Sequence, residues 1–465
     1  MTVIRPNSIS GVTSITGQSG DISIFRADGT AADLNVNNIT SGIITATHYG
    51  SGANLTNLPA GQLTGTVADA RLTTVSSSKL SGALPALDGS ALTGVGHSFG
   101  NSSVNTSGII TATSFVPTTG GQLSNRNKVH NGDMRISQRY GTTAHTPSNT
   151  SRNYVIDRWA YWSNQASKAS VQQVTDAPVG FYNSAKCTSL SAHTATSGHW
   201  FGYLTTIEAQ DVYDLEQGTA NAKNFTLSFY VKSSVTGTWA AAVRTKPGSP
   251  SRSYPFNYTI SSANTWERKT ITIPGSTDGT WLTGNSEGIC IWFDLGTGSS
   301  FHATANQWYS GNATGPSASP FIAVNGATWL VTGVQLEVGP VATPFEHRNY
   351  GEELARCQRY YEHSYNTGTV PGTANNSGSV MFLTNRNTGT AHTMLRYVVR
   401  KRSEPTLVSY SPTETNTTGM RDLDNSTTYN YTMNRNGETG CTAYPTGNLG
   451  LGYFIQFHYT ADSEF

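Results

Sequence analysis

Aromatic residues in polar loops are the side chains of this sequence best suited to chemistry. Trp308 and Tyr309 lie together in the segment 305–312, among asparagine, glutamine and serine residues, and Trp281 lies in a similar loop. Flat rings pack against the C–H faces of pyranose sugars, and planar polar groups hydrogen bond to sugar hydroxyls. The pattern favours carbohydrate binding at Trp308, Tyr309 and Trp281, with packing as the alternative, because most tryptophans of a β protein are packing residues.

Further candidates for the same chemistry lie near the C-terminus. Tyrosine, arginine and aspartate residues cluster there around polar loops. An ordinary role as solvated loop residues is the alternative for each of them. The candidates are Tyr410, Arg421, Asp422, Tyr429 and Tyr431. By contrast, three tryptophans lie inside strand-like runs and are assigned to packing: Trp159, Trp292 and Trp329.

Residues that would support catalysis are few. The sequence contains neither an H-E-x-x-H metal motif nor a phosphate-binding G-x-x-x-x-G-K-[ST] loop. Four acids in one short segment offer the carboxylate pair of a glycosidase, although a solvated acidic loop explains them better. These acids are Glu208, Asp211, Asp214 and Glu216. We therefore expect a protein that is not an enzyme.

Composition excludes several classes of partner. Charged residues make up 12% of the 465-residue chain and the net charge is +1, which predicts no nucleic-acid partner and no polybasic attachment to lipid. The sequence has no apolar run long enough to span a membrane, and its first residues lack the apolar core of a signal peptide. Four widely spaced cysteines favour buried thiols. We expect folding in a reducing cytoplasm.

The N-terminal part, residues 1–124, is poor in residues that form a core. Its octapeptide at 40–47 recurs unchanged at 106–113, and aromatic residues are rare between the two copies. Short repeated β segments with few large side chains become stable by stacking on neighbours or on identical chains. The pattern predicts a thin β shaft or adaptor in a homotrimer.

The following part, residues 125–350, changes composition and contains all nine tryptophans. Apolar residues alternate with polar ones along 225–231, 269–273 and 289–295, and loops rich in glycine, proline and asparagine separate these runs. Period-two alternation is typical of strands that have one buried face. We predict a jelly-roll β-sandwich, which makes the protein all-β overall.

The C-terminal part, residues 351–465, begins with the single convincing helical pattern of the sequence. Glu352 and Glu353 lie at the start of the segment 351–361, where they suit the helix dipole, and Leu354, Cys357 and Tyr361 share one face. Beyond the helix, short apolar runs again alternate with polar loops. We predict a small β-sandwich there.

Several motifs in order resemble the signature of phage tail-fibre and receptor-binding proteins. They occupy residues 131–139, 156–159, 334–346, 357–361 and 458–465. The two octapeptide repeats look like the fibre shafts of cyanobacterial phages. The resemblance implies a homotrimer in a virion, attached to a tail or baseplate protein through its N-terminus and recognising a host-surface polysaccharide or lipopolysaccharide.

The middle part is also similar to jelly-roll carbohydrate-binding modules, through residues 224–232 and 335–337. Such modules often hold a structural calcium, and the resemblance places Asp133 and Glu337 as candidate ligands. This sequence departs from the family by having Arg135 where an acid is common. Calcium takes six to eight oxygen ligands, so backbone carbonyls would have to complete the site.

Three functions compete on these grounds. We expect a tail-fibre adhesin that binds glycans reversibly through several sites. The alternatives are a tailspike-like polysaccharide depolymerase and a purely structural tail connector.

Overall fold

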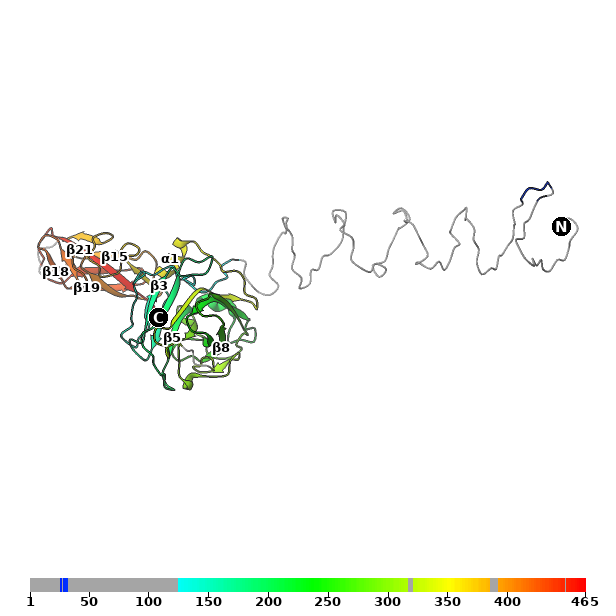
Figure 1. Ribbon diagram of the computed structural model, residues 1–465. Coiled ribbons are helices and arrows are strands. Elements are labelled where there is room, and N and C mark those ends of the chain that lie inside the picture. The colour runs from blue at the N-terminus through cyan, green and yellow to red at the C-terminus, as the bar shows by residue number, and fades with distance from the viewer. Residues whose placement is uncertain (1–25, 27, 32–123, 317–320, 385–391, 448) are drawn as a thin grey trace. The chain divides into compact units, whose positions relative to one another are not determined.

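The computed structural model describes residues 26, 28–31, 124–316, 321–384, 392–447 and 449–465 (Figure 1). The chain divides into two compact units, Met1–Gly108 and Ile109–Phe465. The two octapeptide repeats, and with them most of the predicted shaft, lie outside the described residues. The strands and helices given below all belong to the second unit. The two domain boundaries expected from the sequence, at 124/125 and 350/351, stay predictions.

Two antiparallel sheets form a jelly-roll β-sandwich between residues 153 and 338 (Figure 1). The seven-stranded sheet has the order β1-β2-β5-β10-β7-β8-β11. Its strands are β1 (Asn153–Ile156), β2 (Trp159–Ser163), β5 (Phe201–Glu208), β7 (Gly237–Arg244), β8 (Arg252–Ile260), β10 (Glu287–Asp294) and β11 (Tyr309–Ser310). Short 3-10 helices at Ala209–Leu215 and Ser299–Phe301 follow β5 and β10.

The five-stranded sheet has the order β3-β4-β12-β6-β9. Its strands are β3 (Ala169–Val174), β4 (Ser184–Ser189), β6 (Phe225–Ser233), β9 (Glu267–Ile273) and β12 (Thr328–Val338). Each predicted alternating run therefore forms a strand of one of the two sheets, because a period of two turns successive side chains to opposite faces.

The core of the sandwich lies between the two sheets. Phe229 of β6 packs edge to face on Phe293 of β10, with ring centroids 5.0 Å apart, and Trp329 of β12 contacts the same ring at 5.3 Å. Trp159 and Trp329 are fully buried here, as the assignment to packing predicted. Each large apolar side chain buried in this way contributes roughly 1.5–3 kcal/mol.

One α-helix, α1 (Tyr350–Gln358), connects the sandwich to the C-terminal strands. The Asn349 side chain caps its N-terminus by accepting a hydrogen bond from the Glu352 amide at 2.9 Å. The predicted helix is thus present, with its N-terminal acids in the first turn. It ends at Gln358, however, so that Tyr361, which was predicted on the helix face, begins β13 instead. Cys357 is buried on the inner face, and all four cysteines of the chain are buried and free.

The C-terminal β domain (residues 361–465) contains a six-stranded and a three-stranded antiparallel sheet. The long strand β21 pairs with four shorter strands and shares a hydrophobic core with β20. The strands are β13 (Tyr361–His363), β14 (Val380–Leu383), β15 (Thr393–Arg396), β16 (Thr406–Tyr410), β17 (Met420–Asp422), β18 (Thr427–Tyr429), β19 (Tyr431–Gly437), β20 (Gly440–Pro445) and β21 (Phe454–Asp462). The described chain is nearly all β, which confirms the predicted fold class.

Ion pairs join the sandwich to the C-terminal β domain and to the end of α1. Arg158, which follows β1, pairs with Glu464, and their side chains are 1% and 3% exposed. Glu208 at the end of β5 accepts hydrogen bonds from Nε and Nη2 of Arg359 at 2.7 and 2.8 Å. No helix among the described residues has both the length and the apolar character needed to cross a bilayer.

Candidate functional site

The seven-stranded sheet has apolar side chains on its outer face as well as on its core face. Because Ile291 and Phe293 of β10 point into the core, Cys290 and Trp292 point outward. The outward residues of neighbouring strands join them in a second hydrophobic cluster, separate from the sandwich core. Its buried members are Ala160, Leu204, Cys290 and Trp292, with Tyr154, Trp162 and Trp200 partly buried around them.

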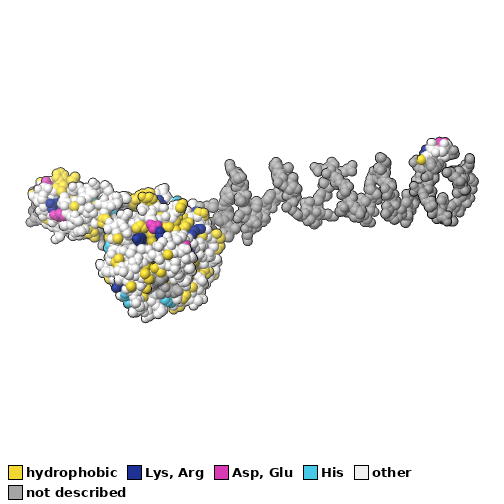
Figure 2. Space-filling model, viewed as in Figure 1, with side chains coloured by type: hydrophobic (Ala, Val, Ile, Leu, Met, Phe, Trp, Pro, Cys, Tyr) yellow, Lys and Arg dark blue, Asp and Glu magenta, His cyan; other side chains and the backbone are white. Residues whose placement is uncertain are grey.

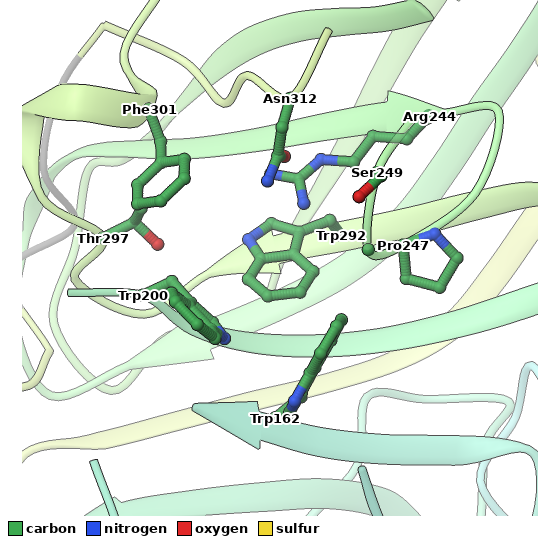
Figure 3. Close-up of a pocket in the computed structure, with 10 residues that line it drawn as sticks. Trp162, Trp200, Arg244, Pro247, Ser249, Trp292, Thr297, Phe301 and Asn312 are labelled. Atoms are coloured by element: carbon green, nitrogen blue, oxygen red, sulfur yellow. The ribbon is translucent and has the colours of Figure 1, made fainter. Parts of the chain in front are cut away.

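Three tryptophans of this cluster line a cavity of about 400 Å³, which we call the outer-face pocket (Figure 3). The centroid of the Trp162 ring lies 6.1 Å from that of Trp292 and 6.1 Å from that of Trp200, both in edge-to-face geometry. The described lining residues are Trp162, Trp200, Arg244, Pro247, Gly248, Ser249, Trp292, Thr297, Phe301 and Asn312. A small-molecule site of this size is typically apolar with a few polar groups, as here.

Gly202 makes room for the Trp292 ring. It lies opposite Trp162 of β2 in the sheet ladder, and a Cβ atom placed on it would stand 2.2 Å from Cζ2 of Trp292. Because Gly202 has no side chain, the Trp292 indole of β10 can lie flat over β5 at this position. The requirement is steric, and it fixes the floor of the outer-face pocket.

Gly202→Ala should displace the Trp292 ring. Overpacking of this kind costs about 1–3 kcal/mol, so thermal unfolding should begin at a lower temperature and tryptophan fluorescence should change. Gly248→Ala is the matched control in the same pocket, since its Cβ would stand 3.6 Å from Trp162, an ordinary contact. Unchanged stability and fluorescence in Gly202→Ala would show that Trp292 does not depend on this space.

Polar groups in the outer-face pocket are few and largely unpaired. The buried Nε1 atoms of Trp200 and Trp292 and the Oδ1 atom of Asn312 have no hydrogen-bond partner among the described residues. Arg244 is 2% exposed, and its guanidinium lies over the Trp292 ring at 4.3 Å. Burial lowers the pKa of Arg244 to about 10, which still leaves it charged at neutral pH.

The sequence-predicted tryptophans Trp281 and Trp308 lie together, but away from the lining of the outer-face pocket. Their rings contact each other edge to face at 5.9 Å and pack against the sandwich core. The Trp308 Nε1 atom donates to the Pro274 carbonyl at 2.8 Å, and the Trp281 Nε1 atom donates to the Asp278 carbonyl at 3.1 Å. Tyr309, in β11, is 46% exposed. Sugar binding by these three residues stays a prediction.

The candidates near the C-terminus mostly have structural partners. Arg421 pairs with Glu414 at 2.9 Å, and buried Asp422 accepts backbone amides of the turn that follows β17. Tyr429 and Tyr431 pack against the core of the C-terminal β domain. Tyr410 is half-buried in β16. The role of these five residues in binding stays a prediction.

The two candidate calcium ligands have protein partners in the structure. The Asp133 carboxylate faces Arg135, with 2.8 Å between Oδ2 and Nε. Glu337 accepts hydrogen bonds from Gln335 and Thr343. In the part of the chain that the structure describes, no three His, Cys, Asp or Glu side chains gather as metal ligands. Calcium binding by Asp133 and Glu337 stays a prediction.

Sequence reasoning missed Trp162, Trp200 and Arg244, and it treated Trp292 as a packing residue alone. Trp292 is indeed buried, at 1% exposure, but it also forms the floor of the outer-face pocket. A signal was present in the predicted strand 289–295. If alternate residues from Ile289 point inward, then Trp292 must lie on the opposite face.

Comparisons with known proteins give no family. No family model matches the sequence, and no curated protein matches it significantly. Among solved structures, the enzymatically active domain of tailspike protein 4 of bacteriophage CBA120 is 16% identical with a TM-score of 0.25, over 46% of this chain and 21% of that one. A family 11 carbohydrate-binding module from Clostridium thermocellum is 14% identical with a TM-score of 0.23, over 44% of this chain and 100% of that one.

A CBM4 structure is similar at 15% identity and a TM-score of 0.24, over 45% of this chain and 99% of that one. Identities and TM-scores this low carry no argument about family or ligand. The case for a function therefore depends on the geometry of the outer-face pocket.

Proposed function

We propose that the chain binds a cell-surface glycan in the outer-face pocket. The observation that carries the proposal is a cavity lined by three tryptophans, on the solvent side of a sheet whose other side already has a complete core. Half-buried Trp162 and Trp200 offer ring surface to the C–H faces of a sugar, and the unpaired polar atoms offer partners for its hydroxyls.

A glycan array probed with the full-length chain tests this function. We expect binding to a group of glycans that share one sugar unit, because one pocket of about 400 Å³ holds only one or two rings. The absence of binding to any glycan would contradict the proposal and favour a purely structural connector.

We propose binding without cleavage. The Glu208 carboxylate, a candidate glycosidase acid, is held by Arg359 and by the hydroxyl of Tyr360 at 2.5 Å. Two segments match the G-x-S-x-G pattern of a nucleophile elbow, at 96–100 and at 284–288. The first lies outside the described residues, and the second leads into strand β10, whereas a nucleophile elbow joins a strand to a helix. Incubation with a bound polysaccharide should release no new reducing ends. Their release would instead favour a depolymerase.

A role as a homotrimeric tail fibre of a phage virion extends this proposal. Its support is the core-poor repeat region at 1–124 and the ordered motifs given above. The C-terminal β domain also exposes apolar side chains (Figure 2). Met381, Leu383 and Phe454 are 57%, 53% and 44% exposed, and Leu383 is paired directly with Phe454 across β14 and β21. We assign this face to contact with a second copy of the chain.

Light scattering at micromolar concentration should give three times the chain mass of 49.7 kDa. Three linked sites can raise the avidity for a surface roughly 10²–10⁴-fold over a single site, which suits weak individual sugar contacts. A folded monomer at this concentration would contradict the trimer, while leaving glycan binding by each chain untouched.

A further inference from the structure

Arg244 has no ion-pair partner among the described residues, although it is almost fully buried. Its Nε atom donates to the Ala313 carbonyl at 3.2 Å, and its guanidinium lies over the Trp292 ring. Arg158, which is buried to the same degree, has the Glu464 carboxylate beside it. A buried charge is costly unless an opposite charge or several hydrogen bonds compensate it. The guanidinium of Arg244 therefore retains most of its capacity to bind an anion.

No acidic side chain among the described residues forms an ion pair with Arg244. Asp294 is near enough to raise the pKa of Arg244, but its Oδ1 atom accepts the backbone amides of Gly296 and Thr297, each at 2.6 Å. None of the described residues that line the outer-face pocket is acidic. An anionic ligand would thus meet one positive charge there and no lining carboxylate.

The unpaired polar atoms of the outer-face pocket suit a sugar that has an acidic group. Figure 3 shows the guanidinium between the Asn312 amide and the Trp292 ring. The Nε1 atoms of Trp200 and Trp292 are donors, and Asn312 Oδ1 is an acceptor. A guanidinium fork matches the two oxygens of a carboxylate, while the remaining groups match hydroxyls.

We infer that the glycan recognised in the outer-face pocket contains an acidic sugar, whose carboxylate pairs with Arg244 and whose ring packs against the exposed surface of Trp162 or Trp200. The inference rests on the proposed function and narrows it to one class of ligand. Such a ligand would supply the carboxylate partner that Arg244 lacks in a pocket lined by three tryptophans.

The test compares acidic probes with their neutral forms on the full-length chain. The probes are oligosaccharides of glucuronate, galacturonate and mannuronate, each also prepared with its carboxyl groups reduced to primary alcohols. We expect at least one acidic probe to bind about 10-fold or more tightly than its reduced form. This preference should shrink as the salt concentration rises, because salt screens the charge of a partly exposed ligand.

Variants locate the effect at Arg244. Arg244→Gln should weaken binding of the acidic probe about 10- to 100-fold, the range of a hydrogen bond to a charged group, with little effect on the reduced probe. Arg244→Lys keeps the charge but lacks the planar guanidinium. Its affinity for the acidic probe should therefore lie between the affinities of the unaltered chain and of Arg244→Gln. Arg268→Gln is the matched control, because it makes the same change on β9 of the other sheet.

The outcomes separate this inference from the proposed function. Equal binding of the acidic and reduced probes, or binding to neutral glycans alone, overturns the inference and leaves glycan binding intact. Failure to bind any glycan overturns both. If thermal unfolding shows that Arg244→Gln does not fold, the comparison of acidic and reduced probes on the unaltered chain still decides whether the recognised glycan is acidic.

Discussion

Glu464→Gln should lower the free energy of unfolding by about 3–5 kcal/mol, because it leaves a buried arginine without its opposite charge. The Arg158 side chain is 1% exposed, lies over the Tyr360 ring at 3.3 Å and pairs with Glu464. Glu464 also lies 3.6 Å from Arg139. The Glu464 carboxylate thus faces the guanidinium groups of both Arg158 and Arg139 where the sandwich meets the C-terminal β domain. Chemical denaturation, with the free energy extrapolated to water, measures the change.

Asp462→Asn is the matched control for this prediction. It removes a carboxylate that pairs with the same Arg139 at 2.9 Å, but the Asp462 side chain is 40% exposed. Ion pairs with solvent access contribute about 0–1 kcal/mol. Equal losses in Asp462→Asn and Glu464→Gln would show that burial does not set the strength of the contact between the two domains.

The double variant Trp162→Ala/Trp200→Ala should reduce affinity for the glycan identified on the array by roughly 100-fold or more. Tryptophans at the centre of a binding site each contribute about 2 kcal/mol or more. These two rings contact each other at 6.1 Å, so the effects of the single variants should not simply add. Isothermal titration calorimetry on the single and double variants measures the loss.

Trp266→Ala provides the comparison for the double variant. Trp266 is a half-buried tryptophan beside β9, on the other sheet, and donates to Asp176 at 3.2 Å. Its removal should leave affinity unchanged. If Trp266→Ala and the double variant lose affinity equally, or if neither loses any, the outer-face pocket is not the glycan site.

Much of the fold follows from local pattern in the sequence. Period-two alternation located β6, β9 and β10, since each of these strands has one face against a core. The start of α1 follows from the acids of its first turn. The pairing order of strands far apart in sequence, such as β5 with β10, depends on packing over long distances, which local pattern does not encode.

The site was harder to predict than the fold, because both faces of the seven-stranded sheet contain large apolar side chains. Trp292 has the sequence environment of a core residue and is buried like one, yet it faces away from the core of the sandwich. Trp308 has the sequence environment of an exposed loop residue but packs inward. The steric role of Gly202 could not be predicted from the sequence, because it depends on the Trp292 ring that covers Gly202 in the fold.

A structure of the full-length protein in complex with its tightest-binding glycan tests the central claim most directly. We expect a sugar ring in contact with Trp162 or Trp200, on the outer face of the seven-stranded sheet. A sugar bound instead at Trp281 and Trp308, or among the loops of the C-terminal β domain, would contradict the assignment of the outer-face pocket.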